Sequence, residues 1–375
     1  MNSSEGSSVT RRATLLQWLV DAPGRLSHWL TPRRPPLPPS TLNLTDIAGM
    51  VRDSPRSNGV LSLEQGLRIY GDSDAALTWA GSARTAFACG GVHGSRTVPM
   101  LREFTNALRE SGYRRALLFP IDQGERADCL EGGFPSVRVG MEALLRKDTF
   151  HLQGKSFVDL RQMLNRAKKR YQLDVWEVDP STGVEDLHAV YQRWLLQKPT
   201  WTPMALVVGS PSFDTPLGRR YFAVGDRHDR RAKAFISLGP GWQGRGWGLD
   251  VMARDPDAPA GAMEFLITRA ASQVFDEGAE HFSLGAAPLY AGPHPALKPA
   301  HQLERIMGWI FASRIAKRFF HFKALARFKM KFSPTWTPVY IGIWPRPSIR
   351  ALYGGCRMWG LFGQAHQDPS PRRLS

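Results

Sequence analysis

One acidic residue stands inside an apolar segment in the second half of the chain. Asp250 lies between Leu249 and Val251 in a segment that is predicted to be a strand. A loop rich in Pro, Asp and Gly follows, and a helix is expected to begin near Ala262. A carboxylate next to a loop that aims a helix N-terminus is a common arrangement for binding a polar substrate. The pattern is equally typical of an edge strand whose acid points into water.

A second candidate is a strongly basic helix predicted for residues 157–171. Its apolar positions, Phe157, Leu160, Leu164 and Ala167, recur at helical spacing. The remaining positions carry the polar and cationic side chains Arg161, Asn165, Arg166, Lys168, Lys169 and Arg170. Such a helix could contact phosphate groups of a nucleic acid, or it could be an ordinary solvated face.

The overall charge supports a polyanionic partner. The chain has 49 Lys and Arg against 33 Asp and Glu, a formal net charge of +16. A positive field of this size attracts nucleic acid or an anionic membrane surface. The alternative is a basic tail without a partner, but the excess also runs through the body of the chain.

The expected elements give an α+β chain of two similar units. In the second unit, a helix at 184–196, strands at 232–238 and 247–252, a helix at 262–278 and a strand at 281–285 follow one another. That order is typical of a GNAT-type acyltransferase core, and the first unit repeats the pattern. Residues 90–94, which are rich in glycine, are interpreted as a turn. The domains are expected at 41–156 and 181–348, joined by the basic helix and a strand at 157–180, with a C-terminal tail at 349–375.

One glycine motif resembles a coenzyme A loop but occurs in the wrong place. Gln243, Gly246 and Gly248 match the Gln-x-x-Gly-x-Gly pattern with which acetyltransferases bind pyrophosphate. That loop must follow a strand and open a helix. Here it is expected to be a hairpin turn before a strand, so we predict no coenzyme A binding.

The N-terminal region, residues 1–40, has a composition of its own. It starts Ser-rich, continues with a basic segment at 11–31 that contains Trp18 and Trp29, and ends in a Pro-rich linker at 32–40. The middle segment could be a helix on a membrane surface or a helix packed on the protein. The sequence has no run of 18 apolar residues and no signal peptide, and its three cysteines are too few for a disulfide framework. A cytoplasmic protein is expected.

Several segments, in order along the chain, resemble one known family. The matching residues are Gly133-Phe134, Gly140-Met-Glu142-Ala143, Phe150-x-Leu152-x-Gly154-Lys155, Leu160-Arg161, Asn165-Arg166, Asp250-Val-Met252, Pro256 to Leu266, Leu284-Gly285-x-Ala287-Pro288-Leu289 and Phe328 to Tyr340. Each match is weak alone, but together they resemble the cytosolic C-terminal synthase domain of aminoacyl-phosphatidylglycerol synthases, the domain of unknown function 2156 group.

The resemblance implies tandem GNAT-type folds joined by a basic helix. It also implies transfer of an aminoacyl group from aminoacyl-tRNA to a lipid hydroxyl, with an anionic phospholipid or membrane surface as the second partner. Asp250 would be the catalytic carboxylate, which accepts the proton of the acceptor or orders the group that does, and the cations of the basic helix would bind tRNA. Substrate-binding roles fall to Arg254, Glu264, Gly285, Lys329 and Lys331. The two lysines would neutralise a phosphate. No metal or other cofactor is expected.

The sequence departs from the family pattern at two positions. The family arginine three residues after the catalytic acid maps onto Ala253, with Arg254 only adjacent, and a family glutamate maps onto Lys317. The usual membrane-embedded half is also not found in this sequence. These departures leave the amino acid and the acceptor open. They favour a small-molecule acceptor, whereas the basic N-terminal segment favours a membrane lipid at the inner face of the membrane. An acetyltransferase and a non-catalytic binding module are the remaining alternatives.

Overall fold

The computed structural model describes residues 67–197 except 83, residues 217–292 and residues 322–358. It also describes shorter stretches between 37 and 64 and residues 302, 304 and 305. The segment at 11–31, Lys317 and the far C-terminus lie outside the described residues, so the expectations placed on them stay predictions.

The first half of the chain contains one long amphipathic helix that packs on its sheet. Its elements are α2 (Leu44–Arg52), α3 (Asn58–Glu64), β1 (Arg68–Gly71), β2 (Ala75–Ser82), β3 (Thr85–Gly94), α4 (Thr97–Glu110), β4 (Arg115–Ile121), α5 (Arg126–Glu131) and β5 (Ser136–Arg146). Met100, Leu101, Phe104 and Leu108 of α4 recur at intervals of three and four residues, so one side of the helix is apolar and is buried on the sheet.

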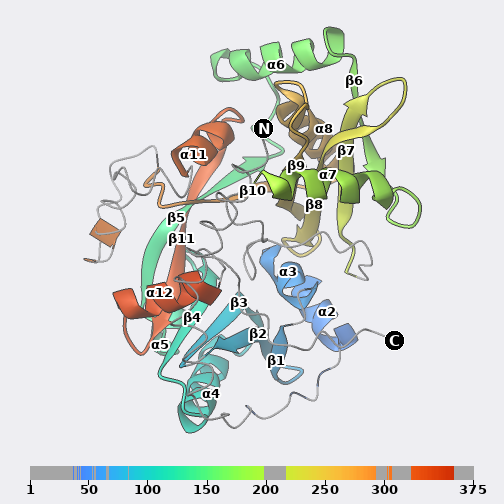
Figure 1. The fold of residues 1–375 in the computed structure, drawn as a ribbon. Helices are drawn as coiled ribbons and strands as arrows, with labels where there is room; N and C mark the ends of the chain where they lie inside the picture. The colour runs from blue at the N-terminus through green and yellow to red at the C-terminus, as the bar shows by residue number, and fades with distance from the viewer. Residues whose placement is uncertain are drawn as a thin grey trace, which may run out of the picture.

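The second half begins with the predicted basic helix. Its elements are η1 (Lys155–Phe157), α6 (Val158–Lys169), β6 (Leu173–Val178), α7 (Val184–Leu196), β7 (Arg220–Asp226), β8 (Ala232–Gly241), β9 (Gly246–Arg254), α8 (Ala262–Asp276), β10 (His281–Pro288), α11 (Phe322–Met330), β11 (Thr335–Trp344) and α12 (Ile349–Met358). Helix α8 is buried along most of its length, because it packs on the sheet and on α6. Figure 1 shows α6 above α8 at the end of the molecule opposite α4.

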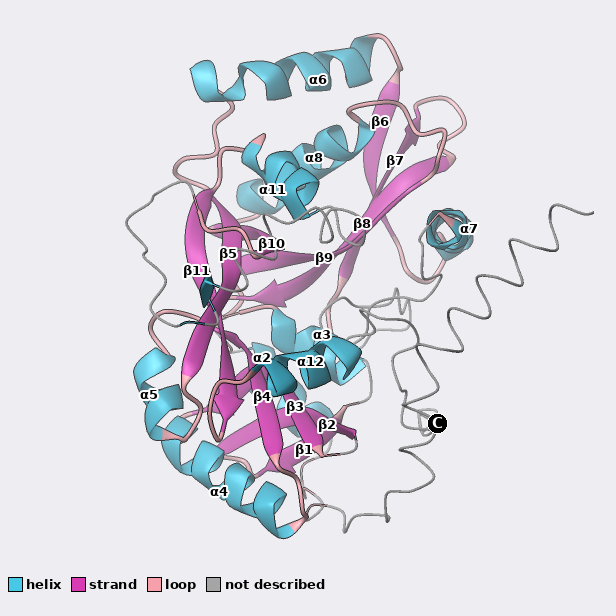
Figure 2. Cartoon of the chain, turned by 60° about the vertical axis from the view of Figure 1, so that its left-hand side comes forward, coloured by secondary structure: helices cyan, strands magenta, loops and turns pink. Residues whose placement is uncertain are grey.

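The strands form one continuous sheet across both halves. The order is β1-β2-β3-β4-β11-β5-β10-β9-β8-β7-β6. Strand β11 pairs antiparallel with both β4 and β5, and β5 pairs antiparallel with β10. Each half therefore places one strand inside the other half, and the two strands lie side by side in the middle of the sheet (Figures 1 and 2).

Both halves contain the same parallel crossover. Strand β3 leads through α4 to the parallel strand β4, and β9 leads through α8 to the parallel strand β10. In both cases an antiparallel run of strands precedes the crossover. The predicted α+β fold class, with two units of similar element order, is confirmed.

The glycine-rich residues 90–94 do not form the predicted turn. They continue β3, and the pairing with β2 shifts so that Leu77 pairs with Val92 while Thr78 pairs with Cys89. Gly90 and Gly91 make this bulge with φ angles of 86° each, a conformation that side chains with a Cβ rarely adopt.

The second glycine motif forms the hairpin that the sequence predicts. Strand β8 ends at Gly241 and β9 begins at Gly246. The Gln243 N–H of the turn donates to the carbonyl oxygen of Ser54 at 3.2 Å, so the hairpin is attached to the first half. Gly248 is a point of close approach, because a Cβ there would lie 2.6 Å from Cβ of Ser57.

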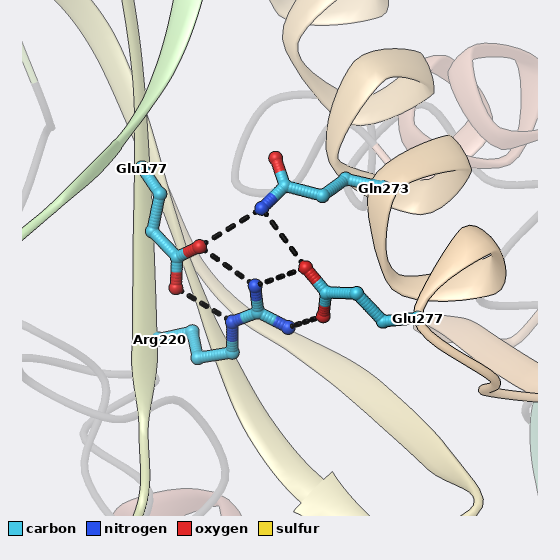
Figure 3. Close-up of polar contacts among 4 residues, drawn as sticks. All are labelled: Glu177, Arg220, Gln273 and Glu277. Carbon is cyan, nitrogen blue, oxygen red and sulfur yellow. Dashed lines mark hydrogen bonds and ion pairs between the residues drawn. The ribbon is translucent and has the colours of Figure 1, made fainter.

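A polar cluster ties three elements of the second half together. Arg220 of β7 donates to both oxygens of Glu177 on β6, at 2.6 and 2.7 Å, and to both oxygens of Glu277 after α8. The Gln273 amide bridges the two acids at 2.9 and 3.0 Å (Figure 3). The hydrogen bonds to Glu177 and Glu277 raise the pKa of Arg220, whereas burial lowers it. The hydrogen bonds dominate, so the pKa is raised overall. The cluster fixes the C-terminal end of α8 against the sheet.

Among the described residues, no helix has both the length and the apolar character needed to cross a membrane.

Candidate active site where strands β9 and β10 diverge

The parallel pairing of β9 with β10 covers only three positions. Gly246 to Gly248 pair with His281 to Ser283, after which β9 stays with β8 and β10 stays with β5. A bulge between Ser283 and Ala286 marks the divergence, and Gly285 adopts a φ of 77° there. The backbone of both strands beyond this point is therefore available to groups other than a neighbouring strand.

A buried amine lies at the divergence. Lys329 of α11 is 3% exposed, and its Nζ donates to the carbonyl oxygen of Ala286 at 2.7 Å. A Cβ at Gly285 would lie 3.6 Å from this Nζ and 3.7 Å from the carbonyl oxygen of Leu249, so the amine and this part of β9 are both close to Gly285. Burial lowers the pKa of Lys329 from its ordinary value of 10.5 to about 7, although the charge of Glu142 opposes the change.

An acid from the first half completes this cluster. Ser283 Oγ donates to Oε1 of Glu142 on β5 at 2.5 Å and accepts the Gly285 N–H at 2.9 Å. Burial lowers the pKa of Arg56 in the first half, and the charges of Asp122 and, to a smaller extent, Glu142 oppose the change. The exchange of β5 therefore brings a carboxylate of one half next to a lysine of the other.

Asp250 lies in a second cluster on β9. Its Oδ2 is 2.8 Å from Nη1 of Arg219, and the two side chains are 2% and 0% exposed. Ser237 Oγ donates to the same oxygen at 3.3 Å and accepts the Val251 N–H at 3.1 Å. Tyr191 of α7 belongs to this cluster, because burial and the charge of Asp250 raise the pKa of its hydroxyl to about 12.

The two clusters suit different chemistry. The Asp250 carboxylate is enclosed and paired with a guanidinium, an arrangement that fixes the strand and its neighbours in one geometry. An amine whose pKa is near 7 can accept and return a proton at neutral pH. The catalytic role predicted for Asp250 stays a prediction, and Lys329 is the described group that is better placed for proton transfer.

The other predicted substrate residues divide into two sets. Lys331 pairs with Glu264 in the first turn of α8, at 2.7 Å, and Gly285 lies beside Lys329. Arg254 is exposed at the end of β9, while Ala253 is fully buried beneath α7. The structure therefore brings four of the predicted residues to the region between α8, α11 and β10 and leaves Arg254 outside it.

The residues at the start of α8 do not fit the pyrophosphate of coenzyme A. The helix N-terminus that would bind this group carries Glu264 in its first turn, and Glu264 already has a cation partner in Lys331. Helix α6 also packs closely there, because a Cβ at Gly261 would lie 3.5 Å from the backbone oxygen of Met163. The matching glycine motif is in the β8–β9 hairpin.

The basic helix is formed as predicted, but one of its cations has a structural role. Nη1 of Arg161 donates to the carbonyl oxygens of Leu152 and Gly154 at 2.8 and 2.9 Å and holds the preceding loop. The exposed members of the predicted set are Asn165, Arg166, Lys168, Lys169 and Arg170. These five side chains form the surface that could contact a polyanion.

Sequence reasoning did not select five residues of these clusters as site residues. Glu142 belongs to a segment that matches the family pattern, and Ser283 lies two residues before the matched Gly285, so both could have been found. Arg219, Ser237 and Tyr191 lie in three separate elements or loops with no local motif. Only the fold brings them together around Asp250.

Solved structures and a sequence relative resemble this chain. The C-terminal domain of a putative lysylphosphatidylglycerol synthetase from Agrobacterium fabrum has a TM-score of 0.69 and 24% identity, and covers 84% of this chain and 96% of that domain. The structure of L-PGS from Bacillus licheniformis has a TM-score of 0.68 and 20% identity, and covers 85% and 97%. At these identities the two structures establish the fold.

The phosphatidylglycerol lysyltransferase of Bacillus subtilis is 29% identical over 280 residues. This alignment covers 73% of the present chain but 32% of the relative, so the chain corresponds to about a third of that protein. The family model described as phosphatidylglycerol lysyltransferase, C-terminal, matches residues 53–343, which is most of the sequence. The chain therefore belongs to the family of phosphatidylglycerol lysyltransferase C-terminal domains.

Proposed function

We propose that this protein transfers an aminoacyl group from aminoacyl-tRNA to a hydroxyl of an anionic phospholipid such as phosphatidylglycerol. The observation that carries the proposal is the buried Lys329 amine, which donates to Ala286 where β10 diverges from β9 and has a pKa of about 7. Family membership supports the substrate class. Because charged tRNA is a cytoplasmic molecule, the reaction would take place at the inner face of the membrane.

The reaction requires little chemical machinery. An aminoacyl ester is already activated, so the enzyme must orient the acceptor, remove its proton and stabilise the oxyanion. Lys329 Nζ would accept the proton of the lipid hydroxyl as its oxygen attacks the ester carbonyl. The bond to the tRNA 3′ oxygen then breaks, and the proton passes from Lys329 to that leaving oxygen. The net result is one ester bond formed and one broken.

Glu142 is the acid that acts electrostatically on Lys329, and it would bind the ammonium group of the aminoacyl substrate. This role matters because the family glutamate predicted to do so maps onto Lys317. Lys331 would contact a substrate phosphate by exchanging its contact with Glu264. The exposed cations of α6 would follow the tRNA backbone and give salt-dependent binding with little base recognition.

The test is transfer of labelled amino acid from a mixture of charged tRNAs to total lipid vesicles. Label should become lipid-soluble with the parent protein and fall at least a hundredfold with Lys329→Met. Lys147→Met removes an exposed lysine at the end of β5 and is the matched control. Transfer by Lys329→Met at the control rate would refute the assignment. Label that enters only water-soluble products would replace the lipid with a small-molecule acceptor.

Asp250 needs a separate experiment, because its carboxylate is one half of a buried ion pair. Asp250→Asn alone leaves the Arg219 charge buried and should cost about 3–5 kcal/mol of unfolding free energy. The double variant Asp250→Asn with Arg219→Gln removes both charges and should recover much of that loss. If Asp250 has a catalytic role beyond the ion pair, Asp250→Asn abolishes transfer, and the folded double variant does not recover it. Restored transfer would reduce Asp250 to a structural residue.

A further inference from the structure

Helix α12 presents an exposed face that combines apolar and cationic side chains. Ile349 and Tyr353 are 60% and 56% exposed, and Arg350 and Arg357 are exposed beside them. Arg346, just before the helix, is also exposed. Within α12, position 353 is three or four residues from positions 349, 350 and 357, so these four positions share one side of the helix.

The opposite side of α12 is fixed to the sheet. Ala351 and Met358 are buried in the apolar cluster formed by β3, β4, β5 and β11, and the helix packs on β3 and β4. Gly355 permits this close approach, because a Cβ there would lie 2.7 Å from a methyl carbon of Leu117. Figure 1 shows α12 beside these strands. The orientation of the exposed face is therefore set by the core.

The charge of this face has one sign. The segment from Arg346 to Met358 contains three arginines and no acidic residue. Cations around exposed apolar side chains are characteristic of helices that lie in the interface of an anionic membrane. The exposed face of α6 differs, because its cations accompany polar side chains and a single exposed apolar residue, Val158. That composition fits a nucleic-acid backbone, whereas the composition of α12 fits lipid.

We propose that α12 is a membrane-docking helix. Ile349 and Tyr353 enter the boundary between headgroups and acyl chains, and Arg346, Arg350 and Arg357 contact the phosphates of anionic lipids. The proposal deepens the proposed function, since it gives the protein a surface for reaching a lipid acceptor, and it rests on that function for its purpose. Its physical content, lipid binding by a defined helix face, is measured independently of transfer.

Another exposed apolar residue provides a matched control. Leu130 of α5 is 62% exposed, comparable to Ile349, but it lies next to Glu131 and two residues from Asp128. Acidic neighbours repel an anionic surface, so Leu130 should not contribute to membrane binding. Leu130→Ser removes as much exposed apolar surface as one of the test substitutions without touching α12.

The experiment is co-sedimentation of the full chain with vesicles of phosphatidylcholine alone or mixed with phosphatidylglycerol. Ile349→Ser with Tyr353→Ser should weaken partitioning into mixed vesicles roughly tenfold. Arg346→Gln, Arg350→Gln and Arg357→Gln together should weaken it roughly a hundredfold and remove the preference for anionic lipid. Leu130→Ser should bind like the parent, and thermal unfolding should show that every variant is folded.

Three results would overturn the proposal. The first is that both α12 variants bind vesicles like the parent, and the second is that the parent does not bind anionic vesicles. The third is that the α12 variants lose tRNA binding, because that result would assign the helix to RNA. Transfer to a short-chain, water-soluble phosphatidylglycerol separates this proposal from the proposed function. The α12 variants should retain it. If no protein transfers label to any acceptor but the α12 variants lose vesicle binding, the proposed function fails and the docking helix stands.

Discussion

Replacing Lys329 by Met should change how the stability of the protein depends on pH. The folded protein holds the pKa of this amine at about 7, whereas the unfolded chain has the ordinary value of 10.5. Between these values the unfolded state binds more protons, so the unfolding free energy rises with pH across this window. At about 1.4 kcal/mol per pH unit, the whole window corresponds to about 5 kcal/mol, and the side chain is buried enough that solvent screening removes little of it.

The assay is urea unfolding of the parent and of Lys329→Met at pH 7 and pH 9.5. Other groups titrate over the same range, so the quantity of interest is the difference between the two proteins. The parent should gain about 3 kcal/mol more than the variant between the two pH values. Equal gains would mean that the amine is not held in its neutral form, and the assignment of Lys329 as a proton acceptor would lose its physical basis. In the transfer assay, the same property predicts a rate that rises towards pH 7 and is level above it.

Two further predictions concern contacts that do not involve Lys329. Gly248→Ala should destabilise the protein by about 1–3 kcal/mol, because the new Cβ meets Ser57. In a double-mutant cycle measured by denaturant unfolding, Ser57→Gly should suppress most of this cost. An undiminished cost would refute the contact. Replacing Arg166, Lys169 and Arg170 by Gln should weaken tRNA binding and lower the slope of log K against log salt by about 2 in filter-binding measurements. An unchanged slope would place the tRNA elsewhere.

Local elements could be predicted from the sequence because their patterns are local. The helix at 184–196 and the strand at 173–178 have the predicted bounds, and α8 begins at Ala262 as expected. The family resemblance, carried by short motifs in order, is confirmed by the family model. The hairpin reading of Gln243 to Gly248 also holds, since it depends only on which element follows the glycines.

The parts that could not be predicted depend on pairing between distant segments. No periodicity indicates that β11 inserts between β4 and β5, because the partners are separated by about 200 residues of sequence. Asp250 can be buried because its charge is paired with that of Arg219. Arg219 precedes another strand, β7, and no sequence motif marks it as the partner. The glycines of β3 predict a turn but form a bulge, because a bulge within a strand and a turn between strands both favour glycine.

The mutual insertion of β5 and β11 has a consequence for how the protein is made. Strand β11 is synthesised about 200 residues after β4 and β5, and until it arrives these two strands each expose an unpaired edge. The neighbouring helix α11 brings Lys329 at the same late stage. The sheet is therefore prone to wrong edge pairing until β11 arrives, and its two halves are joined in a single closing event. A chain truncated before β11 should bind chaperones and expose a sheet edge rather than fold as a smaller enzyme.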